Sequence, residues 1–393
     1  MNILFVRNYA SVDGMFTLLL RLGKKFKQDG HNIFYIDFGV KTELDAEIVE
    51  TFKLLTPMDL LARKNLPDID VLFPFADGDL LYWSINKLKN NYFKNAKFIM
   101  GVYHPRAYYN STYLGPSPDT RIYRSLFRII PSENIVFMNE IVKREHENYF
   151  KLKFTNSPII PLPIKLENKL RDFKNVNRKK IVSVGRLENS KKYVIAMMEV
   201  IVQLTDEGHD YKFYIYGHGQ LKDFIINYIK SKNIGHNIFF MGVLEYKNLY
   251  AVLQDAFMFV GTGTALIEAS SMGIPSLQAI DSEKRLVSYG FFDTLKGLSL
   301  GEINEDLPLI NMKSSIKELA QKNAREYYEL SLAHISRANI FNIDEVIKQY
   351  YSFINNASVI VDIKLSAYKL FGNKILRQFY KLKAITKIQY RSR

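Results

Sequence analysis

The chain has 393 residues and a formal net charge of +14, from 54 Lys and Arg against 40 Asp and Glu. Its length predicts two or three domains, and a 47% hydrophobic fraction with 24% charged residues excludes a mainly disordered chain. The lack of cysteine excludes disulfide scaffolds and thiolate sites, and no apolar run approaches the ~18–20 residues of a membrane-spanning helix.

The first apolar run, Ile3–Val6, is too short for a signal peptide and is followed at once by Arg7. It predicts a buried strand, and we therefore expect a cytoplasmic protein. The apolar residues between Met15 and Phe26 are spaced as in an amphipathic helix. Further short apolar runs in the first half predict strands at Ile33–Ile36, Val71–Phe73, Phe98–Val102 and Ile135–Met138.

The second half repeats this alternation of strand and helix. Its predicted strands are Ile181–Val184, Phe213–Tyr216, Ile238–Met241, Phe257–Val260 and Ser276–Ala279. Runs of four or five apolar residues suit strands buried on both faces. The repeated alternation predicts parallel sheets with right-handed crossovers.

The pattern breaks between residues 158 and 180. Proline-rich sequence at Ser157–Pro163 is followed by polar residues up to Lys180. We therefore expect an α/β protein with two similar domains facing each other across a cleft. In such sheets ligands bind beyond the carboxyl ends of the strands, so the residues after each strand are the candidates for a site.

Two such residues lie in the first half. Gly14 opens the helix after the first strand, where a bare backbone could approach a ligand. His104 follows the strand at Phe98–Val102 and precedes Pro105. A turn glycine and a structural histidine are the ordinary alternatives.

The second half has more such residues. Arg186 and Lys191 share one strand-to-helix loop, so their charges could converge on one anion such as a diphosphate. Two solvated surface cations are the alternative. Gly217 and Gly219 follow the next strand and permit close backbone approach.

The sequence after Val260 favours an anion site at a helix start. Thr262, Gly263 and Thr264 would begin a helix with free N–H groups and hydroxyls. Glu268 follows one turn later on an otherwise small and apolar helix. A buried carboxylate needs hydrogen bonds, which two vicinal sugar hydroxyls or a neighbouring loop would supply.

Together these motifs resemble the donor domain of retaining GT-B glycosyltransferases of family 4. The resemblance rests on Gly185-Arg186-Leu187-x-x-x-Lys191, strand-Gly217-x-Gly219, Phe239-x-x-Gly242 and Glu268-Ala-x-x-x-Gly273-x-Pro275. It covers about residues 181–280. The first half is similar only through Gly14, His104-Pro105 and residues 159–163.

The resemblance implies a GT-B fold with three parts. Residues 1–165 would form a Rossmann-like acceptor-binding domain, and residues 178–345 a Rossmann-like nucleotide-sugar-binding domain. Residues 346–393 would form C-terminal helices and a basic tail that partly pack back on the first domain.

The resemblance also implies roles for individual residues. Arg186 and Lys191 would bind the donor diphosphate and stabilise its departure, and His104 would lie near the donor sugar. Donor binding would further involve Gly14, Gly217, Gly219, Thr262, Gly263, Thr264 and Glu268, with Glu268 on the ribose hydroxyls. No metal or other cofactor is expected.

One position departs from the family pattern. Such enzymes commonly carry a second glutamate eight positions before Glu268, and Val260 stands there. The hydroxyl of Thr262 or Thr264 could contact the sugar instead. The Asp77-Gly-Asp79 motif is interpreted as a turn or helix cap rather than as a metal site.

Residues 364–393 carry nine Lys and Arg and no Asp or Glu. Apolar residues on one helical face make this tail suitable for an anionic membrane surface. A helix packed on the body is the alternative, and no nucleic-acid-binding signature is present.

The resulting hypothesis is a retaining, metal-independent glycosyltransferase on the inner face of the cytoplasmic membrane. It would move a sugar from a nucleotide diphosphate sugar to a glycan or lipid-linked acceptor in bacterial cell-surface polysaccharide synthesis, such as O-antigen, capsule or lipopolysaccharide. A sugar-nucleotide epimerase and an inactive carbohydrate-binding protein are the alternatives.

Overall fold

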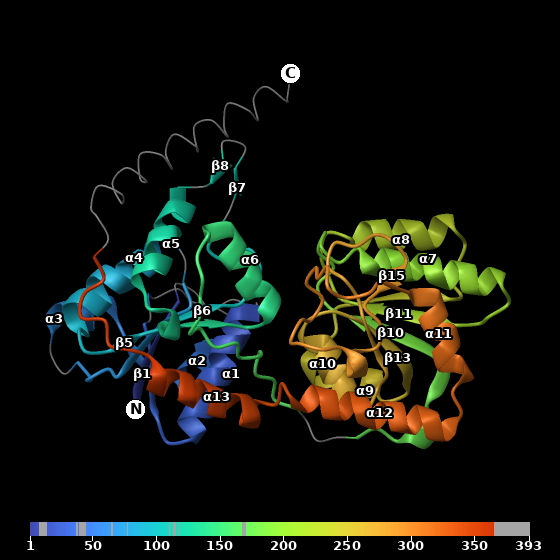
Figure 1. Ribbon diagram of the computed structural model, residues 1–393. Helices are drawn as coiled ribbons and strands as arrows, with labels where there is room; N and C mark the ends of the chain where they lie inside the picture. The colour runs from blue at the N-terminus through green and yellow to red at the C-terminus, as the bar shows by residue number, and fades with distance from the viewer. Residues whose placement is uncertain are drawn as a thin grey trace. The chain divides into compact units, whose positions relative to one another are not determined.

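The protein divides into two compact units, seen in a computed structural model (Figure 1). The first unit comprises Met1–Pro163 and the chain from Val346 onward, and the second comprises Ile164–Glu345. The structure describes residues 1–7, 14–36, 38, 45–63, 66–76, 78–109, 111–112, 115–116, 118–166 and 170–364.

The first unit is built on a five-stranded parallel sheet of order β3-β2-β1-β4-β5. Its β1 is central, and Ile3–Val6 are fully buried, as the sequence predicts for a strand covered on both faces. The strands of the unit are β1 (Asn2–Val6), β2 (Asn32–Ile36), β3 (Lys53–Leu55), β4 (Val71–Pro74), β5 (Lys97–Phe98), β6 (Met100–Val102), β7 (Ser111–Thr112), β8 (Gly115–Pro116) and β9 (Ile135–Phe137).

The prediction of a single strand at Phe98–Val102 is wrong. The segment forms β5, which pairs with β4, and β6, which pairs with β9. The chain changes partner at Ile99, whose N–H donates to Leu72 of β4 at 3.1 Å. One apolar run therefore pairs first with β4 and then with β9.

Helices surround this sheet, and the last of them comes from the far end of the chain. They are α1 (Gly14–Gln28), α2 (Asp45–Thr51), α3 (Pro57–Ala62), α4 (Gly78–Trp83), the π-helix η1 (Ser84–Tyr92), α5 (Pro118–Ile129), the 3-10 turn η2 (Ser132–Asn134), α6 (Glu140–Phe150) and α13 (Ile343–Asn356). From Val346 onward α13 belongs to the first unit. There Tyr350 is fully buried, and its hydroxyl lies 3.0 Å from that of Tyr103.

The second unit repeats the topology of the first. Its parallel sheet has the order β12-β11-β10-β13-β14. If the strands are numbered from β10 as the first, this is the same 3-2-1-4-5 order as in the first unit. This confirms the prediction of an α/β protein with two Rossmann-like sheets. The strands are β10 (Asn177–Val184), β11 (Lys212–Tyr216), β12 (Ile238–Gly242), β13 (Ala256–Gly261), β14 (Ser276–Gln278), β15 (Val287–Ser288) and β16 (Ile310–Asn311).

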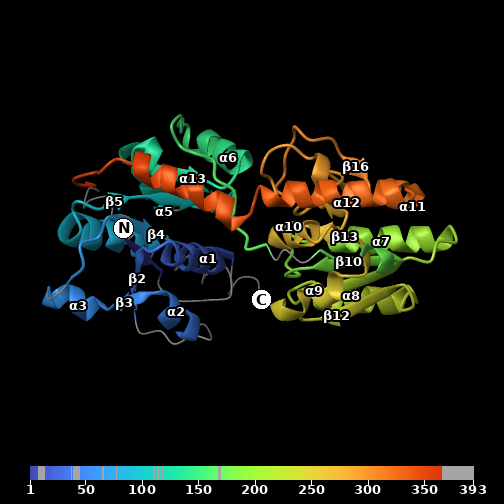
Figure 2. The same cartoon turned by 90° about the horizontal axis from the view of Figure 1, so that it is seen from below.

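Helices cover both faces of the second sheet. In Figure 1, α7 and α8 lie above it and α9, α10 and α12 below it, and Figure 2 shows the unit from below. The helices and 3-10 turns are η3 (Phe173–Asn175), α7 (Tyr193–Asp206), α8 (Lys222–Ser231), η4 (Tyr246–Asn248), α9 (Leu249–Leu253), α10 (Thr264–Ser271), η5 (Phe292–Thr294), α11 (Met312–Gln321) and α12 (Ala324–Asn339). Each unit has its own apolar core.

Candidate functional site

Two glycines join the loops that follow β10 and β11. Gly217 has φ +147°, and a Cβ there would lie 1.9 Å from the carbonyl oxygen of Gly185. Gly219 has φ +143°, and its Cβ would lie 2.6 Å from the backbone of Leu187. The N–H of Leu187 donates to the carbonyl of His218 at 2.7 Å. The close approach that the sequence predicts is therefore made to a neighbouring loop, and donor binding by these glycines stays a prediction.

Arg186 stands in the middle of this joined pair of loops. Its side chain is exposed, while Leu187 beside it is buried. Within the part of the chain that the structure describes, no carboxylate pairs with the Arg186 guanidinium. Its backbone is fixed on both sides, since Gly185 also donates to Tyr216 at 3.1 Å. The loop thus presents an exposed cation at the carboxyl end of β10.

Lys191, five residues later, has defined partners. Its ammonium Nζ donates to Thr262 Oγ1 and to Asp281 Oδ1, at 2.6 Å each. Asp281 follows β14, at a strand end where site residues are expected, but it was not predicted from the sequence. The two predicted cations therefore differ, because Lys191 is paired with a carboxylate while no carboxylate of the described residues pairs with Arg186.

The start of α10 lies beside this network. Gly263 is its N-cap, with φ +71°, and no atom of the described residues lies within 4 Å of where its Cβ would be. The N–H of Gly263 donates to the carbonyl of Leu300 at 2.7 Å. The prediction that this N–H is free to bind an anion is therefore wrong. The N–H groups of the first turn, from Thr264 onward, have no partner inside the helix and favour negative charge.

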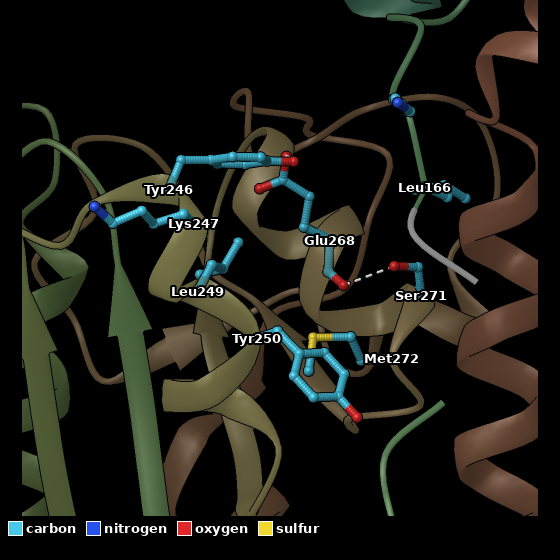
Figure 3. A pocket seen from close by; sticks show the side chains of 9 residues that line it. Leu166, Tyr246, Lys247, Leu249, Tyr250, Glu268, Ser271 and Met272 are labelled. Carbon is cyan, nitrogen blue, oxygen red and sulfur yellow. Dashed lines mark hydrogen bonds between the residues drawn. The ribbon is translucent and has the colours of Figure 1, made fainter. Parts of the chain in front are cut away.

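Glu268 lies one turn along α10 and lines a pocket of the second unit (Figure 3). Its carboxylate and the hydroxyl of Tyr246 point toward each other, and Tyr246 donates to Glu268 Oε1 at 3.3 Å. Ser271, Tyr250 and Met272 line the same pocket. Glu268 is half-buried, so its carboxylate can still meet a ligand. Tyr246 was missed in the sequence, because an aromatic residue in a loop carries no distinctive pattern.

In the first unit, Gly14 begins α1, as predicted, and it is exposed; its role in donor binding stays a prediction. His104 is exposed in the turn after β6, and its Nδ1 accepts from the N–H of Arg106 at 3.0 Å. It lines a cavity of about 300 Å³ together with Arg7 and Tyr108. Tyr108 has φ +63°, which is strained for a bulky residue.

Other predictions concern the rest of the chain. Residues 365–393 and Asp77 lie outside the described residues, whereas α4 begins at Gly78, inside the Asp77–Asp79 motif. Among the described residues, no group of three or more His, Asp or Glu is placed to hold a metal ion. No helix in the same part of the chain is long and apolar enough to cross a membrane.

Residues 166–280 match the family described as glycosyl transferases group 1. The matched segment contains Arg186, Lys191 and Glu268. The chain has a GT-B fold.

A curated relative of this GT-B protein is the poly(ribitol-phosphate) alpha-N-acetylglucosaminyltransferase of Staphylococcus aureus (strain COL). The two are 23% identical over 284 residues, which cover 70% of this chain. The match spans only 54% of the relative, about half of its length.

Solved structures show the same fold. A point mutant of S. aureus TarM, in complex with Fondaparinux, alpha-GlcNAc-glycerol and UDP, has a TM-score of 0.64 at 14% identity, covering 90% of this chain and 99% of that one. The lipopolysaccharide outer core galactosyltransferase WaaB in its apo form has a TM-score of 0.58 at 14% identity, covering 90% and 99%. At these identities the likeness concerns the fold of the GT-B protein.

Proposed function

We propose that the protein is a retaining glycosyltransferase that moves a sugar from a nucleotide diphosphate sugar to a hydroxyl of a glycan acceptor. One observation carries the proposal. Arg186 and Lys191 follow β10, and α10 follows β13, the neighbouring strand of the same parallel sheet. Lys191 Nζ donates to Thr262 just before α10, and Glu268 lies one turn along that helix. That order of groups suits a diphosphate followed by a ribose.

The difficult part of such a transfer is the charge that builds on the leaving diphosphate. The bond from the anomeric carbon to the phosphate oxygen breaks while the acceptor oxygen bonds to the same carbon. The acceptor proton leaves with the released diphosphate. Fixed cations and a helix N-terminus stabilise this departing charge, so we expect activity to persist after treatment with a chelator.

Glu268 and Tyr246 would hold the nucleoside. Two vicinal ribose hydroxyls can donate to the Glu268 carboxylate, and the Tyr246 ring offers an apolar face beside it. UDP is bound in the TarM structure named above, which makes it the first nucleotide to test.

The site is tested with UDP binding and sugar transfer in Arg186→Ala and Glu268→Gln. Each replacement should weaken UDP binding by about tenfold or more, because hydrogen bonds to charged groups contribute about 1.5–3 kcal/mol. Arg325→Ala removes an exposed arginine elsewhere in the second unit and serves as the control. Unchanged binding and transfer in both site variants would refute the proposed site.

The acceptor is proposed to be a lipid-linked cell-surface glycan, with residues 364–393 on an anionic membrane. The charge of this tail and the fold shared with WaaB support the setting. Deleting residues 364–393 should release the protein from anionic vesicles, with neutral vesicles as the control. Equal binding of the full and shortened chains to anionic vesicles would contradict the membrane role.

One residue favours a second candidate, a carbohydrate-binding protein without catalysis. Val260 is fully buried at the end of β13, where the family pattern has a glutamate. Binding of nucleotide sugars without turnover over a broad acceptor panel would support this candidate over the transferase.

A further inference from the structure

The ammonium group of Lys191 belongs to a network that joins three loops. Lys191 Nζ donates two hydrogen bonds of 2.6 Å, to Thr262 Oγ1 and to Asp281 Oδ1. These two acceptors also interact with each other, since Thr262 Oγ1 lies 3.2 Å from Asp281 Oδ1. The three residues follow β10, β13 and β14, which are neighbours in the sheet. The network therefore ties together the loops at the edge where we place the diphosphate.

The partners of Lys191 are themselves held in place. Gly301, with φ +122°, packs against Thr262 so closely that a Cβ would lie 2.4 Å from Thr262 Cγ2. The N–H of Asp281 donates to the carbonyl of Gly301 at 2.8 Å. Tyr193 lies against the same network, where burial and the charge of Asp281 raise its pKa to about 12. The direction of the lysine ammonium is thus set before any ligand binds.

The network also changes what an anion meets. An ammonium group has three N–H donors. Acceptors among the described residues use two of those on Lys191, which leaves one for a phosphate oxygen. The Asp281 carboxylate cancels the lysine charge and repels a diphosphate at that position. The side chains of Lys191 and Asp281 are 22% and 37% exposed, so this repulsion is only partly screened.

We propose that Asp281 is a positioning residue that orients Lys191 and weakens its hold on the diphosphate product. The inference rests on the proposed function, since it concerns the same site. Lys191 then contributes a directed hydrogen bond, while Arg186 supplies most of the attraction. The carboxylate favours release of the nucleoside diphosphate after transfer.

The test replaces the carboxylate by groups that keep an oxygen but lose the charge. Asp281→Asn, with Asp281→Ser as a second variant, should bind inorganic pyrophosphate and UDP about three- to tenfold more tightly by calorimetry. Once the donor sugar nucleotide is known, KM and kcat of both Asp281 variants in the transfer assay should fall together, because the nucleoside diphosphate leaves more slowly. A residue with a merely structural role would not tighten binding.

A matched control lies at the amino-terminal ends of the strands in the same sheet. Asp255 precedes β13, and its Oδ1 lies 2.5 Å from Lys180 Nζ, with side chains 39% and 13% exposed. Asp255→Asn should leave both affinities unchanged. Equal or weaker pyrophosphate binding in both folded Asp281 variants overturns the inference. If Arg186→Ala also binds UDP as the wild type does, the proposed function fails as well.

Discussion

The contact between Gly217 and Gly185 allows a quantitative prediction for Gly217→Ala. The new Cβ would lie 1.9 Å from the Gly185 carbonyl oxygen, far inside van der Waals contact, at φ +147° where side chains are rarely found. The loops must separate by more than an ångström. Backbone strain of about 1–2 kcal/mol and the loss of one or two backbone hydrogen bonds at about 1 kcal/mol each give a destabilisation of about 3 kcal/mol.

Thermal unfolding of the full chain measures this effect. At about 2–4 °C per kcal/mol for a unit of this size, the transition of the second unit should fall by about 6–12 °C. Gly185→Ala is the control on the facing loop, because nothing in the described part of the chain lies within 4 Å of its added Cβ. If Gly217→Ala melts within a degree of the wild type, the glycine does not hold these loops together.

Three further predictions concern buried polar groups. Arg171→Lys should lower the stability of the second unit by about 2–4 kcal/mol in chemical denaturation, since one ammonium cannot replace a buried guanidinium that donates to the Gly273 carbonyl and a tyrosine hydroxyl at 2.8 Å. Asn134→Leu should destabilise the first unit by a similar amount, because Asn134 donates to the carbonyl of Ser358 at 2.8 Å and accepts from its N–H at 3.0 Å; an unchanged melting temperature would contradict this. Burial lowers the pKa of His146 below its usual 6.5, although its hydrogen bonds to backbone carbonyls act in the opposite direction. The neutral imidazole therefore contributes its full stability above pH 6.5, and this contribution is lost as the pH falls through the folded-state pKa. Melting temperatures at about pH 7.5 and about pH 5.5 should differ less in His146→Gln than in the wild type.

The sequence predicts the buried strands well because both faces of a central parallel strand are apolar. It fails at β3, where Lys53 and Leu54 are exposed and only three residues pair at the sheet edge. It also fails to divide β5 from β6, since both are apolar and only the identity of the partner strand changes. Periodicity records burial, and it carries no information about which neighbour a strand selects.

The same limit applies to the candidate site. The positions of Arg186 and Glu268 could be predicted because each follows a recognisable strand and turn. The pairing of Lys191 with Asp281 could not be, because residues 90 positions apart meet only when the strand order of the sheet is known. Gly217 illustrates a third case, in which the sequence indicates a tight approach without indicating to what.

The path of the chain at α13 bears on how relatives of this protein can be recombined. The helix begins in the second unit at Ile343, and from Val346 its side chains, among them Tyr350 and Phe353, complete the apolar interior of the first. A hybrid that takes only residues 1–163 from one parent would therefore place a foreign helix in that interior. Exchanging the first unit between two such proteins requires residues 1–163 and the chain from Val346 to Lys364 to come from the same parent.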